Sequence, residues 1–153
     1  MRVYKVLKRD GEELYSCMVG GKARVKYEPC VWVSAPDWLA KEGYHLTAFK
    51  DFWVAEAYYE AIIAPPEVHH ELWEAEAENV IKRLPPKMRV GDVMSGLIVP
   101  WYKDGWPIGT VMAKQIKLVR PMRSTKPEEI KRIIDALRAA GEEVKVSRKG
   151  GAE

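Results

Sequence analysis

A strict alternation from Trp73 to Glu78, within residues 71–81, constrains the fold more than any other feature of the sequence. Apolar side chains occupy every second position (Trp73, Ala75, Ala77), and glutamates occupy the positions between them. Successive side chains of a strand point to opposite faces, so a period of two indicates a strand with one buried face. Alanine and glutamate favour helices, but the burial of a face decides more than propensity does. We therefore predict a strand over residues 72–80 whose glutamates (Glu74, Glu76, Glu78) face solvent.

The N-terminal third has the pattern of several short strands separated by turns. Residues 2–8 alternate loosely and are followed by Asp10-Gly11, a dipeptide typical of tight hairpins. Further apolar runs occupy residues 14–19, 23–27 and 30–34. These runs predict a small antiparallel meander, and residues 109–119 alternate again, which predicts a later strand.

Two segments have the apolar spacing of helices. Residues 50–63 carry a wide apolar face and end before Pro65-Pro66. Residues 127–140 begin with a proline and acidic side chains and end before Gly141, which are typical helix boundaries. Pro36 to Lys41 has the pattern of one helical turn. We predict a single α+β domain over residues 1–146, a small twisted, mostly antiparallel sheet with two helices, and a polar tail over residues 147–153.

Composition narrows the classes of function. The chain has one asparagine, one glutamine, 25 basic residues and 22 acidic residues, and few amides with many charges are typical of thermophiles. The net charge of +3 falls short of the concentrated positive field of a dedicated DNA-binding protein. No uncharged apolar run approaches ~18 residues, and the first residues lack a secretory pattern. We therefore expect a cytoplasmic protein without a membrane partner.

The two cysteines, Cys17 and Cys30, leave two alternatives open. If they lie on paired strands, they could form a disulfide, and the closed loop would add ~3 kcal/mol of stability. Intracellular disulfides are rare outside hyperthermophiles, so the alternative is two buried thiols. The cysteines and histidines do not have the spacing of a zinc site, and we expect no metal.

The string Gly43-Tyr44-His45-Leu46-Thr47 is the first candidate for chemistry. A histidine beside a threonine hydroxyl, between a turn and a helix, could bind a small ligand or a nucleotide. If the protein is an enzyme, the candidates are Tyr44, His45, Thr47 and Glu76, in a nucleotide-handling pocket of ADP-ribosyl-transfer type. The alternative is that His45 is a partly buried strand residue bonded to a backbone carbonyl. Phosphate-binding glycine loops and nucleophile elbows are absent from the sequence, and we expect no cofactor.

Aromatic side chains crowd a predicted turn at residues 101–106. Trp101, Tyr102 and Trp106 surround Lys103, and loops of this kind run over the surface. The cluster could be a small core that covers a sheet edge. It could also contact a protein partner, because tryptophan and tyrosine are enriched in binding hot spots, or it could stack nucleobases.

The order of short motifs along the chain resembles a known group of proteins. The matching residues are Tyr4-Lys5, Asp10-Gly11, Ser16-Cys17, Gly43 to Thr47, Trp73 to Glu76, and Ala113 to Arg120. In this order the chain resembles a loose group of small uncharacterised proteins from bacteriophages and from bacterial or archaeal mobile elements. The resemblance implies a phage-like or mobile-element accessory protein and supports a strand at residues 72–80. It implies no activity and no site residue.

These observations favour a non-enzymatic interaction protein from a thermophile. We expect it to be of viral or mobile-element type and to bind a host or viral protein, in the host cytoplasm if it is viral. Two alternatives stay open: a nucleotide-handling enzyme, and a module that binds nucleic acid weakly. The mild basicity and the tryptophan and tyrosine content favour the second alternative.

Overall fold

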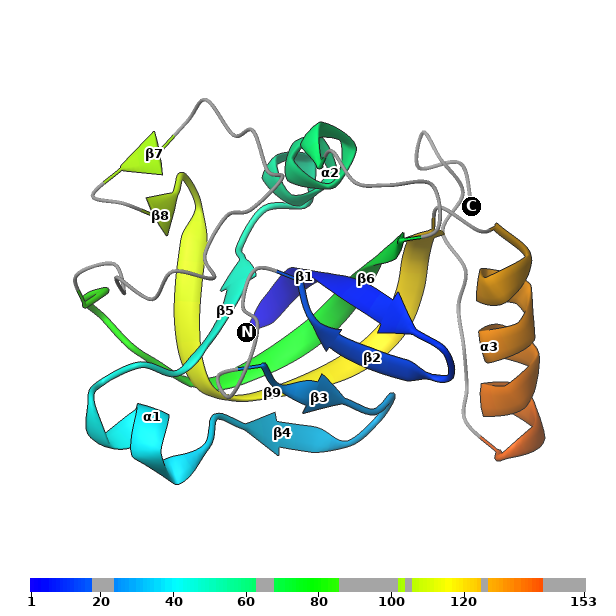
Figure 1. Cartoon of the computed structure of the whole chain (residues 1–153), viewed down its shortest axis with the longest axis horizontal. Helices are drawn as coiled ribbons and strands as arrows, with labels where there is room; N and C mark the ends of the chain where they lie inside the picture. Colours follow the sequence, from blue (N-terminus) through cyan, green and yellow to red (C-terminus); the bar gives the residue numbers. More distant parts are fainter. Residues whose placement is uncertain (18–23, 63–67, 86–101, 104–105, 125–126, 142–153) are drawn as a thin grey trace.

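The computed structural model describes residues 1–17, 24–62, 68–85, 102–103, 106–124 and 127–141 (Figure 1). Within these residues the protein is an α+β fold with a mostly antiparallel sheet, as the sequence predicts. The sheet contains β1 (Arg2–Asp10), β2 (Glu13–Ser16), β3 (Lys26–Tyr27), β4 (Trp32–Ser34), β5 (Leu46–Phe49), β6 (His69–Val80) and β9 (Thr110–Ser124). A separate hairpin pairs β7 (Tyr102–Lys103) with β8 (Trp106–Pro107), and the helices are α1 (Asp37–Lys41), α2 (Phe52–Ala61) and α3 (Pro127–Ala139).

The strands of the sheet close into a ring. Strand β6 pairs with both β1 and β9, and β5 also pairs with both, so the four strands form a small barrel-like closure. The long strands β6 and β9 curve across the molecule in Figure 1. Their pairing shifts register between Leu72 and Trp73 and again between Glu74 and Ala75, which are irregularities that let long strands bend. Strands β2 and β3 continue the sheet beyond β1.

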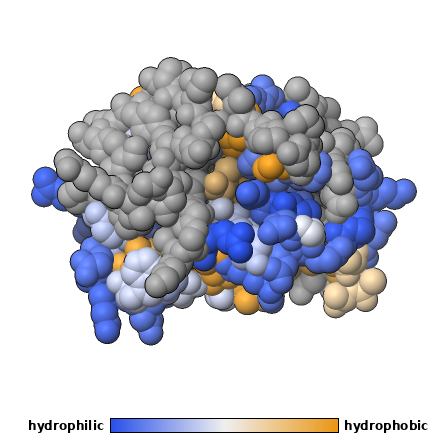
Figure 2. Space-filling model, viewed as in Figure 1, coloured by the Kyte–Doolittle hydropathy of each residue, from blue (hydrophilic) through white to orange (hydrophobic). Residues whose placement is uncertain are grey.

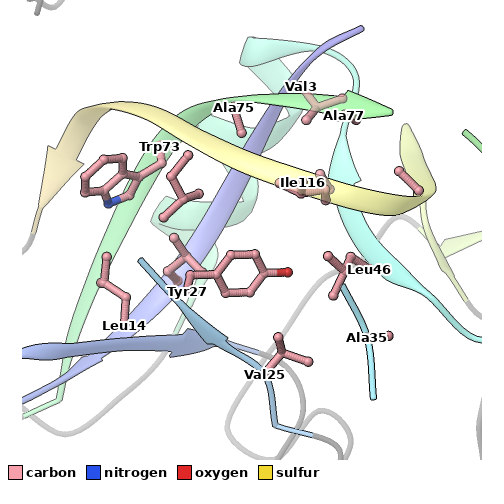
Figure 3. Packing of buried hydrophobic residues seen from close by; sticks show 14 of the residues in the cluster. Val3, Leu14, Val25, Tyr27, Ala35, Leu46, Trp73, Ala75, Ala77 and Ile116 are labelled. Carbon is pink, nitrogen blue, oxygen red and sulfur yellow. The ribbon is translucent and has the colours of Figure 1, made fainter. Parts of the chain in front are cut away.

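The predicted strand at residues 72–80 is confirmed as the main part of β6. Trp73, Ala75 and Ala77 are buried, as the alternation predicts, and they point into the core shown in Figure 3. The ring of Tyr27, from the short strand β3, lies at the centre of the same view. The alternation therefore identified the inner face of the barrel correctly.

The prediction that all three glutamates of this strand face solvent is wrong for Glu74. Its residue is only 8 % exposed, whereas Glu78 is exposed and Glu76 is partly buried. Arg120 of β9 donates hydrogen bonds to the Glu74 carboxylate from Nε and Nη2, and the guanidinium of Arg2 lies 3.7 Å away. The side chains of the two flanking strands therefore cover and neutralise this carboxylate.

The predicted N-terminal meander is correct for three strands and wrong for the fourth. Strands β1, β2 and β3 pair antiparallel in chain order, but β4 pairs with β9. The chain leaves the meander at Cys30, whose φ of 63° is in the left-handed region. The backbone N–H of Cys30 donates to the carbonyl of Leu118 at 2.9 Å, which directs the chain onto β9.

Both predicted helices are confirmed with slightly shorter bounds, and the helical turn expected at residues 36–41 is α1. Helix α2 covers the outer side of the sheet, where its buried residues pack with those of the strands beneath (Ala55, Tyr58 and Tyr59 with Val6, Phe49 and Leu72). Helix α3 lies against the sheet through Ile134 and Leu137. The polar tail at residues 147–153 lies outside the described residues.

Candidate functional site

The string at residues 43–47 leads into β5. Tyr44 and His45 precede the strand and are partly buried, and Tyr44 packs against the main core. The backbone N–H of His45 donates to the sulfur of Met112 at 3.4 Å. Desolvation lowers the pKa of His45, and the positive charge of Lys114 lowers it further. Thr47 is partly buried, and its backbone carbonyl accepts a hydrogen bond from Lys5 Nζ.

The fourth enzyme candidate, Glu76, does not join this group. Glu76 pairs with Lys117 on one edge of β9, whereas Thr47 pairs with Met112 on the other edge. These positions are five residues apart along β9, which corresponds to about 17 Å in an extended strand. The Glu76 carboxylate instead lies 3.7 Å from the amino group of Met1. The structure thus keeps three candidates near β5 and places the carboxylate elsewhere.

The aromatic turn forms the β7–β8 hairpin, in which Lys103 pairs with Trp106. Trp106 is partly buried, and its indole Nε1 donates to the carbonyl of Pro85 at 2.8 Å. Trp101 and the side chains of Tyr102 and Lys103 lie outside the part of the chain that can be described. The role of these aromatic rings as a contact site therefore stays a prediction.

A more exposed aromatic side chain lies at the start of α2. Trp53 is 74 % exposed, although it belongs to the first turn of a well-packed helix. Its ring meets the ring of Phe52 at 5.6 Å between centroids, and Phe52 meets Tyr4 of β1 edge-on at 5.6 Å. This chain of ring contacts joins the exposed indole to the sheet.

The turn between β8 and β9 packs against the same end of α2. The carbonyl of Gly109 accepts a hydrogen bond from the backbone N–H of Lys50 at 3.1 Å. Val54 faces Gly109 so closely that a Cβ at this glycine would lie 3.4 Å from the valine side chain. The preceding residue, Ile108, is 51 % exposed. We call Trp53, Ala57 and Ile108, all exposed, the Trp53–Ile108 surface.

Sequence reasoning did not identify this surface, because the apolar spacing of residues 50–63 does not tell which part of the wide apolar face packs against the sheet. The buried residues of α2 are Ala55, Tyr58 and Tyr59. Trp53 and Ala57 are four residues apart and therefore share a different stripe of the helix. This second apolar stripe, outside the stripe of buried residues, was the sequence signal that could have indicated the surface.

The described part of the face in Figure 2 is mainly hydrophilic, with small hydrophobic areas near the centre.

Cys17 and Cys30 do not form the disulfide that the sequence left open. Cys17 packs against the cluster beneath α2, and burial raises the pKa of its thiol to about 12. A thiol with such a pKa is almost entirely protonated near neutral pH and is therefore a poor nucleophile. Cys30 lies at the turn that leads to β4. We therefore assign no chemistry to Cys17.

Comparisons with family models, with curated proteins and with solved structures find no match. Among the described residues, no helix is both long enough and apolar enough to cross a bilayer.

Proposed function

We propose that this protein is a non-enzymatic accessory protein that binds another protein through the Trp53–Ile108 surface. The observation that supports this proposal is the 74 % exposure of Trp53 on an ordered helix. Leaving so large an apolar side chain in water forgoes the free energy that its burial would supply. Tryptophan is also among the residues most enriched in binding hot spots.

The setting of Trp53 favours a protein partner. The ring contacts to Phe52 and onward to Tyr4 restrict the indole before binding, so less conformational entropy is lost in a complex. Ile108, next to the glycine that faces Val54, adds a second exposed apolar side chain from a different part of the chain. Lys50 and Asp51, which immediately precede α2, are exposed and supply polar groups of both signs at its border. An apolar centre with a polar rim is the usual anatomy of a protein interface.

The proposal includes the biological setting that the motif order implies. We place the protein among phage-like or mobile-element accessory proteins of a thermophile, acting in the host cytoplasm. Its partner would be a host or viral protein. An ADP-ribosyl-transfer type of reaction has less support, because Glu76 and Thr47 lie far apart along β9.

The test begins with capture from a lysate of the source organism on three immobilised baits: the natural chain, Trp53→Ala and Trp38→Ala. Trp38 of α1 is also exposed and gives a matched control. A captured protein is then purified and titrated against each chain by calorimetry. We expect Trp53→Ala to weaken the purified complex by at least ~30-fold, as for a hot spot worth ~2 kcal/mol, and Trp38→Ala to leave it unchanged. Equal affinity of the natural chain and Trp53→Ala would refute the proposed surface.

A further inference from the structure

The outer face of strands β6, β9 and β4 carries a second group of polar and aromatic side chains. Directly paired residues of an antiparallel ladder share one face, and on these strands Ala77 and Ile116 point into the core. The alternate positions therefore point outward and form two rows across the three strands. These rows, which we call the Trp32 face, are Glu76, Lys117 and Trp32, and beside them Glu78, Gln115 and Ser34.

The only asparagine and the only glutamine of the chain meet at this face. Nδ2 of Asn79 donates to Oε1 of Gln115 at 2.7 Å. Asn79 has a φ of 56°, a conformation that asparagine tolerates better than most residues, so its backbone alone explains an asparagine there. No comparable backbone reason applies to Gln115. Because the sequence otherwise excludes amides, the pairing of both on one exposed face points to a role in recognition.

Trp32 adds a stacking surface and a positive charge to the amide pair. The residue is 41 % exposed, and Nζ of Lys117 lies over its ring, 5.2 Å from the centroid, so a base that stacks on this side of the ring must displace the ammonium group. An exposed aromatic ring can stack any nucleobase, and a lysine beside it can meet the phosphate of the same nucleotide. The Glu78 carboxylate is exposed two residues beyond Glu76 on β6 and can accept hydrogen bonds from ribose hydroxyls.

We propose that the Trp32 face binds a single adenine nucleotide unit. The base stacks on Trp32, and the side-chain amide of Gln115 reads the adenine edge, since an amide can donate to N7 and accept from N6. Lys117 contacts one phosphate. Glu76 and Glu78 lie beside this lysine, and the amino group of Met1 lies 3.7 Å from Glu76, so two positive and two negative charges balance here. A balanced charge suits one phosphate better than a long phosphate backbone. This site shares no residue with the Trp53–Ile108 surface.

The experiment is a titration with AMP followed by 1H–15N NMR, in which the Trp32 indole signal is assigned by its loss in Trp32→Ala. We expect AMP to shift the indole signal of Trp32, and we expect Trp32→Ala to weaken binding by about tenfold or more, as base stacking requires. Lys117→Gln should make AMP and adenosine bind equally. Gln115→Glu, which cannot donate to N7, should remove the preference for AMP over UMP. Trp38→Ala serves as the control and should bind like the natural chain.

Two sources of the nucleotide are then distinguished with a short single-stranded oligoadenylate. The ligand is a free nucleotide if the oligoadenylate binds with the same affinity per adenine as AMP, and if this affinity falls with salt as expected for about one phosphate contact. Tighter binding with a steeper salt dependence, lost in Trp32→Ala, indicates adenine within a single strand. The proposal is overturned if millimolar AMP leaves the spectrum of the folded natural chain unchanged. It is equally overturned if Trp32→Ala binds AMP as well as the natural chain does.

Discussion

Replacing the buried Lys5 by methionine should change how stability depends on pH. Lys5 is 7 % exposed and lies on the inner side of β1. Its Nζ donates to the carbonyl of Thr47 and lies 5.4 Å from the ring centroid of Tyr27. Desolvation lowers the pKa of Lys5 from 10.5 to about 8, and the charge interaction with Cys17 opposes this shift. The whole shift corresponds to about 3 kcal/mol between the two protonation states.

Stability should rise with pH, because burial shifts the pKa of Lys5 downward. Between pH 8 and pH 10.5 the unfolded chain binds more protons at Lys5 than the folded chain does, so stability rises with pH. Burial raises the pKa values of Cys17 and Tyr27, and their contributions are present at lower pH and are lost as the pH rises above about 9. Between pH 7 and pH 9 the gain from Lys5 exceeds the loss from Cys17, whose ordinary pKa of 9.0 means that its contribution has only begun to fall. The net change over this window is about 1 kcal/mol.

The measurement is urea unfolding at pH 7, 8 and 9, with the free energy of unfolding extrapolated to water. We expect the natural chain to gain about 1 kcal/mol from pH 7 to pH 9, and Lys5→Met to lose this gain. Lys131→Met, at an exposed position on α3, is the control and should keep it. A flat profile in the natural chain, or the same rise in Lys5→Met, would show that the Lys5 amine is not desolvated as described.

Three further substitutions test the packing. Glu71→Gln should lower the free energy of unfolding by about 3–5 kcal/mol, because it breaks the buried ion pair with Arg9. Glu12→Gln, which breaks an exposed pair with Arg132, should lower it by less than ~1 kcal/mol. Equal losses in the two variants would contradict this. Gly109→Ala should cost about 1–2 kcal/mol, because φ is +84° and a Cβ would approach α2; an unchanged melting temperature would argue against this turn. Trp53→Ala should change the free energy of unfolding by less than ~1 kcal/mol, because the side chain is exposed. Trp73→Ala should lower it by about 3–5 kcal/mol, because Trp73 is buried. A large loss in Trp53→Ala would show that Trp53 has a structural role.

The sequence by itself determined the elements whose patterns are local. The alternation from Trp73 to Glu78 sufficed to predict β6 and its inner face, because the two faces of a strand differ in burial whatever its neighbours are. The apolar spacing and the boundary residues predicted α2 and α3 in the same way. Asp10-Gly11 marked the first hairpin, since a tight turn needs residues that tolerate a positive φ.

Only the tertiary structure decided which side chains meet across distant strands. The burial of Glu74 depends on Arg120 and Arg2, which come from two different neighbouring strands. The separation of Glu76 from Thr47 depends on the register of both strands against β9. Trp53 is exposed because the sheet covers only one side of its helix. These outcomes depend on strand order and register, and a local pattern of hydrophobicity does not specify which strands become neighbours.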